Sequence, residues 1–332
     1  MEDAVRIIYG PTGGRFPYMS GLADAIEGEL ARRGVRIIDR IGVSGGIITA
    51  TIRSSGRPFQ SWMAEASQYR EIVSLKSKGV FGTLWNLARY RGFFRTEDVL
   101  DGIFRRVAPR TLDAPCWAVS WCSSSEASVA FELGKEIDTG LGMLASCALP
   151  FAFAPVEMKN SDLHPDVRQR LGVPAYGTST FKDGGLCPDF ATDLAPLPVG
   201  ETSISRPAIL VISVEGQPPK AANPFTRLAL MAGESKTLYG IERAARSQPV
   251  HVVNAYPSAK VNSFAVRFDL NEDEGMVMYE EGLRDGQRAV KSLPWWIRRE
   301  PKILPVATLH PKDPKDAGII PPVDGDSSEL PR

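Results

Sequence analysis

Short apolar runs separated by glycine-rich turns open this sequence. Residues 5–9 and 35–41 are apolar runs with several β-branched side chains, and each is followed by a glycine-containing turn. Such runs are typical of buried strands. Residues 18–33 place apolar side chains at helical spacing instead, and residues 47–52 begin a second helical pattern. The order strand, helix, strand, helix predicts an α/β fold with a central, mostly parallel sheet.

The rest of the chain repeats these two patterns at intervals. Strands are expected at residues 116–122, 127–133, 208–214 and 264–270, helices at residues 226–246 and 275–293, and a strand with a helix within residues 141–154. From residue 304 onward the chain is rich in Pro, Asp and Lys and shows little periodicity. This pattern is typical of a flexible tail. We therefore expect one folded domain over residues 1–303 and a tail over residues 304–332.

Residues 57–110 form a helical segment with an uneven charge. Ten basic and five acidic residues are interleaved there with aromatic side chains such as Trp62, Trp85 and Phe94. The ordinary interpretation is an amphipathic pair of helices that covers the sheet. The alternative is a lid at a lipid interface, with an apolar face toward lipid and cations toward anionic head groups. The sequence leaves both open.

The amino-acid composition limits the classes of partner that are expected for this protein. The chain has 332 residues, of which 43% are hydrophobic, and 39 basic residues balance 39 acidic ones. Because dedicated nucleic-acid binders carry a basic excess, no nucleic-acid partner is expected. No apolar run approaches the roughly 18 residues of a spanning helix, and no signal peptide opens the chain. We therefore expect a cytoplasmic protein, with peripheral membrane contact left open.

The residues between the second strand and its helix read Gly42-Val43-Ser44-Gly45-Gly46. A serine on a sharp strand-to-helix turn projects its hydroxyl above the sheet edge, and the flanking glycines supply the space that such a turn needs. The amides at the start of the following helix point toward any anion that forms there. Ser44 is therefore a candidate nucleophile, and an ordinary turn in which Ser44 caps the helix is the alternative.

A serine nucleophile needs a base, and the sequence is poor in candidates. The three histidines lie in surroundings that suit surface or structural roles: His164, His251 and His310. Asp183, followed by Gly184 and Gly185 at the end of a predicted strand, has room for close approach to another loop. Alone it would be a turn-capping residue. The four cysteines form no CxxC pair, so neither a zinc site nor a disulfide framework is expected.

A third candidate element follows the first strand. Gly13, Gly14 and Arg15 lie in a turn whose successive amides could converge on an oxygen that becomes negative during acyl transfer. A phosphate-binding loop is the rival interpretation. It fits poorly, because the turn contains neither GxxxxGK[ST] nor GxGxxG.

Together these segments resemble the patatin-like phospholipase family, which carries GGGxRG, GxSxG, ASxAxPxxFxPV and DGG in this order. The matching residues are Gly13-Gly14-Arg15, Gly42 to Gly46, Ala145 to Pro150 with Phe153 to Val156, and Asp183-Gly184-Gly185. The resemblance covers about residues 4–290 and leaves the tail outside it. It implies a three-layer αβα fold and a catalytic domain that hydrolyses acyl esters of lipids without metal or cofactor.

The resemblance also implies roles for single residues. Ser44 would be the nucleophile and Asp183 the base of a Ser–Asp dyad without histidine. Gly13, Gly14 and Arg15 would form the oxyanion hole through their amides, with Gly42, Gly46, Gly184 and Gly185 supporting the two turns. The sequence departs from the family where Pro11 and Thr12 replace loop glycines and Phe16 replaces the last one. Because proline has no amide hydrogen, one donor is missing.

Substrate contacts and rival functions follow from the same residues. Leu149, Phe151 and Phe153 are expected to contribute to an acyl-binding wall, and Trp295 and Trp296 beside Arg298 and Arg299 suit either packing or a membrane interface. An acyltransferase would pass the acyl group from Ser44 to an alcohol or thiol instead of water. A catalytically inactive binding protein with the same fold is the other alternative, motivated by the changed loop.

Overall fold

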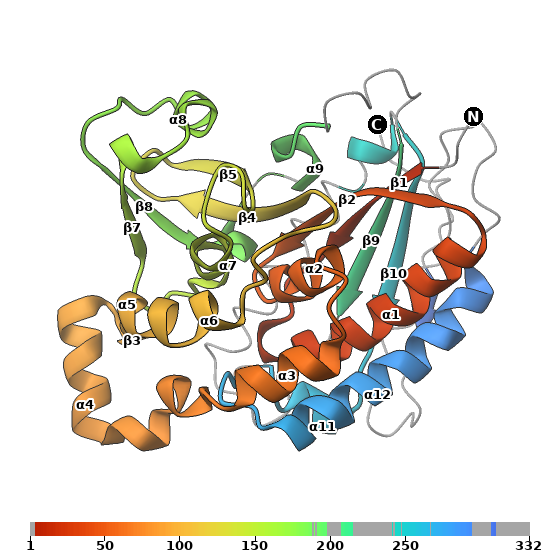
Figure 1. The fold of residues 1–332 in the computed structure, drawn as a ribbon, viewed down its shortest axis with the longest axis horizontal. Coiled ribbons are helices and arrows are strands. Elements are labelled where there is room, and N and C mark those ends of the chain that lie inside the picture. The colour runs from red at the N-terminus through yellow and green to blue at the C-terminus, as the bar shows by residue number, and fades with distance from the viewer. Residues whose placement is uncertain are drawn as a thin grey trace, which may run out of the picture.

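The computed structural model describes residues 4–187, 189, 191–197, 207–214, 241, 243–246, 248–265, 267–293 and 307–309. Its centre is a nine-stranded sheet with helices packed around it (Figure 1). The strands are β1 (Ala4–Tyr9), β2 (Arg36–Val43), β4 (Cys116–Cys122), β5 (Ala127–Glu132), β7 (Val156–Lys159), β8 (Thr178–Asp183), β9 (Ala208–Val214), β10 (Val250–Ala255) and β11 (Ala307–Leu309). A second, two-stranded sheet pairs β3 (Gly92–Phe94) with β6 (Phe151–Phe153).

The main sheet is parallel over most of its width. Its order is β11-β10-β9-β1-β2-β4-β8-β7, with β5 paired to β4. All neighbours from β11 to β4 are parallel, whereas β4 with β5, β4 with β8 and β8 with β7 are antiparallel. β2 and β8 run in opposite directions, but their carboxyl ends meet across the middle of β4, because Val43 of β2 pairs with Val119 and Asp183 of β8 pairs with Ser120.

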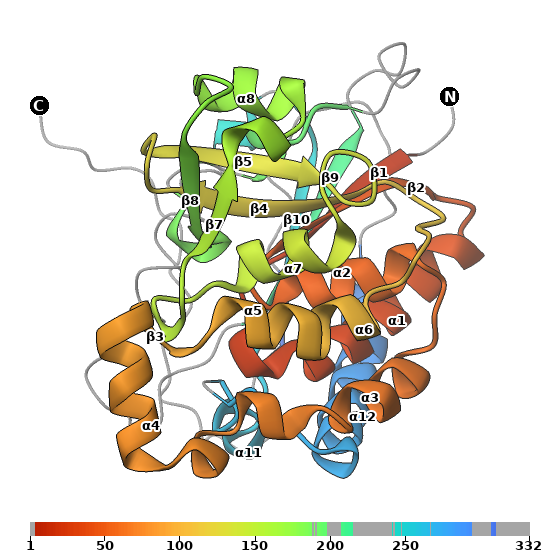
Figure 2. The same ribbon diagram turned by 60° about the vertical axis from the view of Figure 1, so that its left-hand side comes forward.

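Helices connect and cover the strands. They are α1 (Phe16–Arg32), α2 (Gly46–Ser54), α3 (Phe59–Ser67), α4 (Leu75–Tyr90), α5 (Thr96–Val99), α6 (Arg105–Val107), α7 (Thr139–Cys147), α8 (Pro165–Leu171), α9 (Ala191–Leu194), α11 (Ala259–Asn262) and α12 (Glu272–Ala289). α1 and α12 run side by side across one face of the sheet (Figures 1 and 2). α12 begins with a capping box between Asn271 and Glu274, which satisfies amides at the helix start.

The two faces of the sheet carry separate apolar cores. Val5, Ile7 and Tyr9 of β1 join the larger core, which also holds the buried side chains of α1, α2, α7 and α12. Ile8 belongs to a second core, together with apolar residues of α9 and with Ile241, Ala244 and Ala245. Because successive strand residues point to opposite faces, β1 contributes to both cores. The described residues thus form a mixed α/β fold compatible with the three-layer arrangement expected from the sequence.

One sequence prediction is wrong. In the segment 264–270, which was expected to be a strand, residues 264 and 265 lie in a turn and residues 267–270 have no regular secondary structure. Ala265 contacts the glycine-rich loop after β1, and the strand of this region is β10 instead. Residues 307–309, inside the expected tail, form the edge strand β11. The remaining residues of that tail, and most of the helix expected at 226–246, lie outside the described residues.

The segment at residues 57–110 contains α3, α4, β3, α5 and α6, and α4 lies at the periphery in both views (Figures 1 and 2). Trp62 and Phe94 are buried at 3% and 2% exposure, as the packing interpretation expects, whereas Trp85 is 62% exposed. None of the described helices is both long and apolar enough to span a bilayer.

Candidate active site

Ser44 lies on the sharp turn between β2 and α2. Its backbone is left-handed, with φ of 53°, an unfavourable conformation for a residue with a side chain. The turn also needs its glycines. A Cβ on Gly42 would lie 2.3 Å from Cα of Ile47, and a Cβ on Gly46 would lie 2.4 Å from the carbonyl oxygen of Gly10. The strained turn is therefore specified by glycine at these two positions.

Asp183 ends β8 and faces this turn. The Ser44 hydroxyl donates a hydrogen bond to Oδ2 of Asp183 at 2.8 Å, although 139 residues separate the two. The amide of Gly185 donates to Oδ1 of Asp183 at 2.7 Å. The Asp183 amide in turn donates to the carbonyl oxygen of Ala148 at 3.0 Å. The carboxylate is thus held from one side by its own turn, and its second oxygen is directed at Ser44.

Burial changes the acidity of this carboxyl group. Asp183 is 3% exposed, and burial raises its pKa to about 6, because the charged form has lost its hydration. The hydrogen bonds from Ser44 and Gly185 act in the opposite direction, since they stabilise the carboxylate. The net result is a carboxylate that is ionised at neutral pH and more basic than an exposed aspartate.

The end of α7 contacts the backbone of the turn at Ser44. Oγ of Ser146 accepts a hydrogen bond from the Ser44 amide at 3.1 Å. The Cys147 thiol donates to the Ser44 carbonyl oxygen at 3.2 Å. A Cβ on Gly184 would lie 2.2 Å from the carbonyl oxygen of Val119, so the turn after Asp183 packs directly on β4. The segment around residue 146, noted in the sequence for its resemblance alone, therefore fixes both backbone groups of Ser44.

The glycine-rich loop differs from the oxyanion hole that the sequence suggested. The Gly14 amide donates to the carbonyl oxygen of Ala265 at 3.0 Å, and the Arg15 amide donates to that of Thr12 at 3.2 Å. Both donors are thus engaged by the protein itself. The Gly13 amide, in contrast to those of Gly14 and Arg15, has no hydrogen-bond partner among the described residues, and the φ of Gly13 is 56°. The Gly45 amide also has no partner among the described residues. Gly45 was not among the residues expected to form the oxyanion hole.

The two free amides lie close together. A Cβ on Gly45 would be 3.0 Å from the nitrogen of Gly13 and 2.4 Å from its carbonyl oxygen. Both residues line the same pocket as Ser44. The signal for Gly45 was present in the sequence, because the residue after a nucleophile on such a turn commonly supplies an oxyanion donor.

The Arg15 side chain braces the loop. It is 2% exposed, and its guanidinium donates to the carbonyl oxygens of Thr12 and Val214 and to Oδ1 of Asn262, at 3.2, 3.1 and 2.8 Å respectively. These contacts tie the loop after β1 to the end of β9 and to α11. Arg15 is absent from the pocket lining, so its function in this structure is to hold the loop in place.

A largely apolar pocket opens beside Ser44 and Asp183. Its described lining consists of Gly13, Phe16, Ser44, Gly45, Ile48, Trp62, Met63, Ala66, Arg70, Val73, Val99, Ile103, Phe104, Cys147, Leu149, Phe153, Asp183, Phe268 and Leu270. Of the residues expected to form an acyl-binding wall, Leu149 and Phe153 line the pocket, whereas Phe151 is 51% exposed. Phe268 and Leu270 belong to the segment wrongly expected to be a strand. Trp295 and Trp296 lie outside the described residues.

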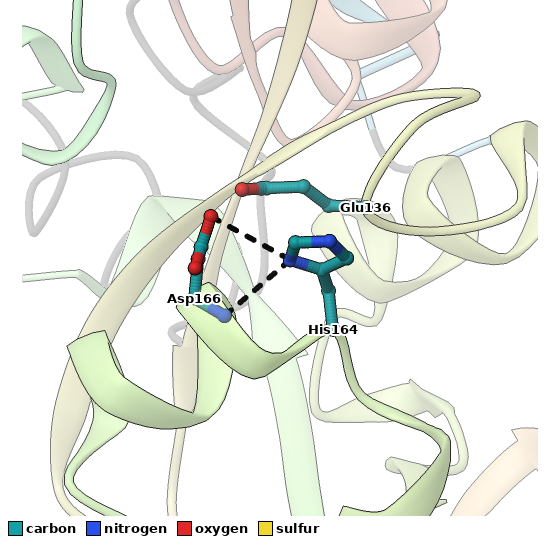
Figure 3. A group of neighbouring side chains, drawn as sticks. All are labelled: Glu136, His164 and Asp166. Atoms are coloured by element: carbon teal, nitrogen blue, oxygen red, sulfur yellow. Dashed lines mark hydrogen bonds and ion pairs between the residues drawn. The ribbon is translucent and has the colours of Figure 1, made fainter.

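The histidines are placed away from this pocket or outside the described chain. His251 is buried in β10, His164 precedes α8, and neither lines the pocket; His310 is not among the described residues. Glu136, His164 and Asp166 lie close enough to share a cation, as Figure 3 shows. Arg170, however, donates to both carboxylate oxygens of Glu136, at 2.9 and 2.7 Å. The ion pair with Arg170 therefore already engages both carboxylate oxygens of Glu136.

Comparisons with known proteins give a sparse result. No model of a known protein family matches the sequence, and no curated protein matches it. Among solved structures, the fold has a distant likeness to VipD from Legionella pneumophila, with a TM-score of 0.36 and 10% sequence identity. The likeness covers 86% of this chain and 74% of that one.

Proposed function

We propose that this protein is a serine acyl hydrolase that cleaves fatty-acyl ester bonds of lipids through an acyl-Ser44 intermediate. One observation carries the proposal: the Ser44 hydroxyl donates to the buried Asp183 carboxylate at 2.8 Å, and both side chains line an apolar pocket. A serine hydroxyl becomes a nucleophile when a base within hydrogen-bond reach takes its proton. The apolar walls suit an acyl chain, and the two polar side chains define where the ester would react.

In the first half of the reaction, Oγ of Ser44 forms a bond to the ester carbonyl carbon while its proton passes to Oδ2 of Asp183. The carbonyl oxygen becomes negative and accepts hydrogen bonds from the free amides of Gly13 and Gly45. One such donor typically contributes about 3 kcal/mol to the transition state. When the tetrahedral intermediate collapses, the carbon–oxygen bond to the alcohol breaks, and the alcohol leaves with the proton held by Asp183.

In the second half, water replaces the alcohol. Asp183 takes a proton from the water as its oxygen bonds to the acyl carbon, and the same two amides hold the oxyanion. The bond to Ser44 then breaks, the fatty acid is released, and Ser44 regains its proton from Asp183. A carboxylate is a weak base for a hydroxyl, so the raised pKa of Asp183 assists this transfer in both halves.

Labelling with a fluorophosphonate tests the proposal directly. We expect the probe to modify Ser44 in the purified full-length protein, as mapped by peptide mass spectrometry, and Ser44→Ala to abolish labelling and ester hydrolysis. Ser161→Ala, which changes an exposed serine, serves as the matched control. Asp183→Asn should lower the rate of ester hydrolysis at least about 100-fold. Hydrolysis that survives in folded Ser44→Ala protein would refute the assignment.

A further inference from the structure

Thr12 is a buried polar residue in the glycine-rich loop after β1. It is 2% exposed, and it stands at a position where the sequence departs from the pattern GGGxRG. It is not among the described residues that line the pocket, so it does not contact a substrate there directly. A hydroxyl that leaves water for the protein interior costs free energy unless it makes a hydrogen bond there. Its position therefore needs an explanation.

The Thr12 hydroxyl contacts both residues whose amides are free. Oγ1 of Thr12 donates a long hydrogen bond to the carbonyl oxygen of Gly13, at 3.3 Å. The same oxygen would lie 2.5 Å from a Cβ built on Gly45, so it packs directly against the backbone of the residue that follows Ser44. That Cβ would also lie 3.0 Å from the Gly13 nitrogen. The hydroxyl is therefore placed where the loop after β1 meets the turn that carries the nucleophile.

The peptide unit between Thr12 and Gly13 carries one of the free amides. Its carbonyl oxygen, which belongs to Thr12, accepts hydrogen bonds from the amide and from Nε of Arg15, both at 3.2 Å. Because the C=O and N–H groups of a planar trans peptide point in opposite directions, these bonds direct the Gly13 N–H away from Arg15. The Thr12 hydroxyl holds the next carbonyl group, that of Gly13. The free Gly13 amide is thus fixed from both sides along the chain.

We propose that Thr12 is a positioning residue whose hydroxyl fixes the free amides of Gly13 and Gly45 in the arrangement that binds the oxyanion. The inference rests on the proposed function, because it assumes that an oxyanion forms at Ser44. Donors are most effective when they are aimed, before the reaction starts, at the place where negative charge develops. A displacement of about 1 Å can cost on the order of 100-fold in rate. A methyl group in place of the hydroxyl would face the Gly13 carbonyl oxygen without a hydrogen to donate, so the loop would shift.

Substitutions of Thr12 in the full-length protein separate the hydroxyl from the volume of the side chain. Thr12→Val keeps the size and loses the hydroxyl, whereas Thr12→Ser keeps the hydroxyl. With a short-chain nitrophenyl ester, we expect Thr12→Val to lower kcat at least about tenfold and to change KM less than twofold. Thr12→Ser should keep kcat within about threefold, and Thr12→Ala should lose activity as the valine variant does. Thr51→Val is the matched control, because it removes a buried hydroxyl that donates within α2, to the Ile47 carbonyl oxygen at 2.7 Å.

Inhibition by a ketone that forms a tetrahedral adduct measures the oxyanion hole itself. In octyl trifluoromethyl ketone, the carbonyl carbon bonds reversibly to Oγ of Ser44, the Ser44 proton passes to Asp183, and the carbonyl oxygen becomes the oxyanion. We expect Thr12→Val to weaken this inhibition by about the same factor as it lowers kcat/KM, because the adduct and the transition state use the same two amides. Octyl methyl ketone, which is far less prone to form the adduct, should inhibit the variant and the unmodified protein within twofold of each other.

Each other outcome overturns the inference. An unchanged kcat in Thr12→Val and Thr12→Ala would mean that the hydroxyl does not position the amides, and an equal loss in Thr12→Ser would assign the effect to the methyl group. A loss of the same size in Thr51→Val would assign it to general destabilisation. A lower kcat with unchanged trifluoromethyl ketone inhibition would place the effect outside the oxyanion hole. Failure of the proposed function appears separately, as absence of Ser44-dependent ester hydrolysis by the unmodified protein, and it would refute both proposals.

Discussion

Ser146 accepts a hydrogen bond from the backbone amide of Ser44 at 3.1 Å, so the end of α7 holds the strained turn that presents the Ser44 hydroxyl. The Ser146 side chain is fully buried. Without its oxygen, the Ser44 amide would have to remain unpaired or the turn would have to relax. The contact therefore links the stability of the turn to the position of the nucleophile.

Ser146→Ala should reduce both stability and activity. Leaving a buried amide without an acceptor costs about 1–3 kcal/mol, and we expect the free energy of unfolding to fall by this amount in urea titrations. The rate of ester hydrolysis should fall as well, because Ser44 loses its fixed conformation. Ser161→Ala is the control, since its hydroxyl lies on an exposed 3₁₀ turn. If the two variants unfold at the same urea concentration, the contact has no supporting role.

A methyl group at Gly45 should disable the site through the loop that faces it. In Gly45→Ala, the new Cβ would lie 2.4 Å from the Gly13 carbonyl oxygen and 2.5 Å from Oγ1 of Thr12, so the loop would have to move. We expect ester hydrolysis to fall at least about tenfold through displacement of the two free amides. Gly28→Ala is the matched control, because its Cβ would meet nothing within 4 Å on an exposed position of α1. That variant should keep full activity and gain up to about 1 kcal/mol.

Much of the fold was predictable because its strands are short, apolar and β-branched. β4 and β9 have the bounds expected from their apolar runs, and the structure brings Ser44 and Asp183 into contact as the sequence suggested. β10 was missed although Val250, Val252 and Val253 gave a strand signal. A strand was wrongly expected at residues 264–270 because the apolar side chains of this segment recur in a strand-like pattern. In the structure, Phe268 and Leu270 face the pocket from an irregular chain.

The details of the oxyanion hole could not be predicted from the loop alone. Gly14 and Arg15 looked like free donors in the sequence, but their amides are bonded to Ala265 and Thr12. The first of these contacts joins residues 251 positions apart, so no local pattern reveals it. Arg70 could not be placed in the pocket lining for the same reason, because the lining comes from segments distributed along the chain.

Activity should depend on pH through Asp183. Burial raises the pKa of this carboxyl group to about 6, and only the ionised form accepts the Ser44 proton. We expect kcat/KM for a short-chain nitrophenyl ester to be level above pH 7 and to fall about tenfold per pH unit well below 6. The measurement is a rate profile between pH 4.5 and 8.5, corrected for any unfolding. A midpoint near 4 would mean that the carboxyl group is not buried during catalysis.

Stability should depend on pH through two groups with opposite effects. Asp183 has its pKa raised from 3.8 to about 6, so the folded state binds the extra proton and the free energy of unfolding falls as pH rises from 4 to 6. Burial lowers the pKa of His251 from 6.5 to about 4, so the unfolded state binds the extra proton and stability rises over nearly the same range. Each shift of about two units corresponds to about 3 kcal/mol, and the two contributions largely cancel.

Single substitutions should separate these contributions. In Asp183→Asn only the contribution of His251 remains, so the free energy of unfolding should increase from pH 4 to 6.5 relative to that of the unmodified protein. At pH 8 the variant should be more stable by up to about 3 kcal/mol, because it has no buried charge at this position. In His251→Gln only the contribution of Asp183 remains, so the free energy of unfolding should decrease from pH 4 to 6. Urea titrations at each pH measure both slopes, with the exposed Asp162→Asn as control. Parallel curves for all the proteins would show that neither group titrates differently in the folded and unfolded chains.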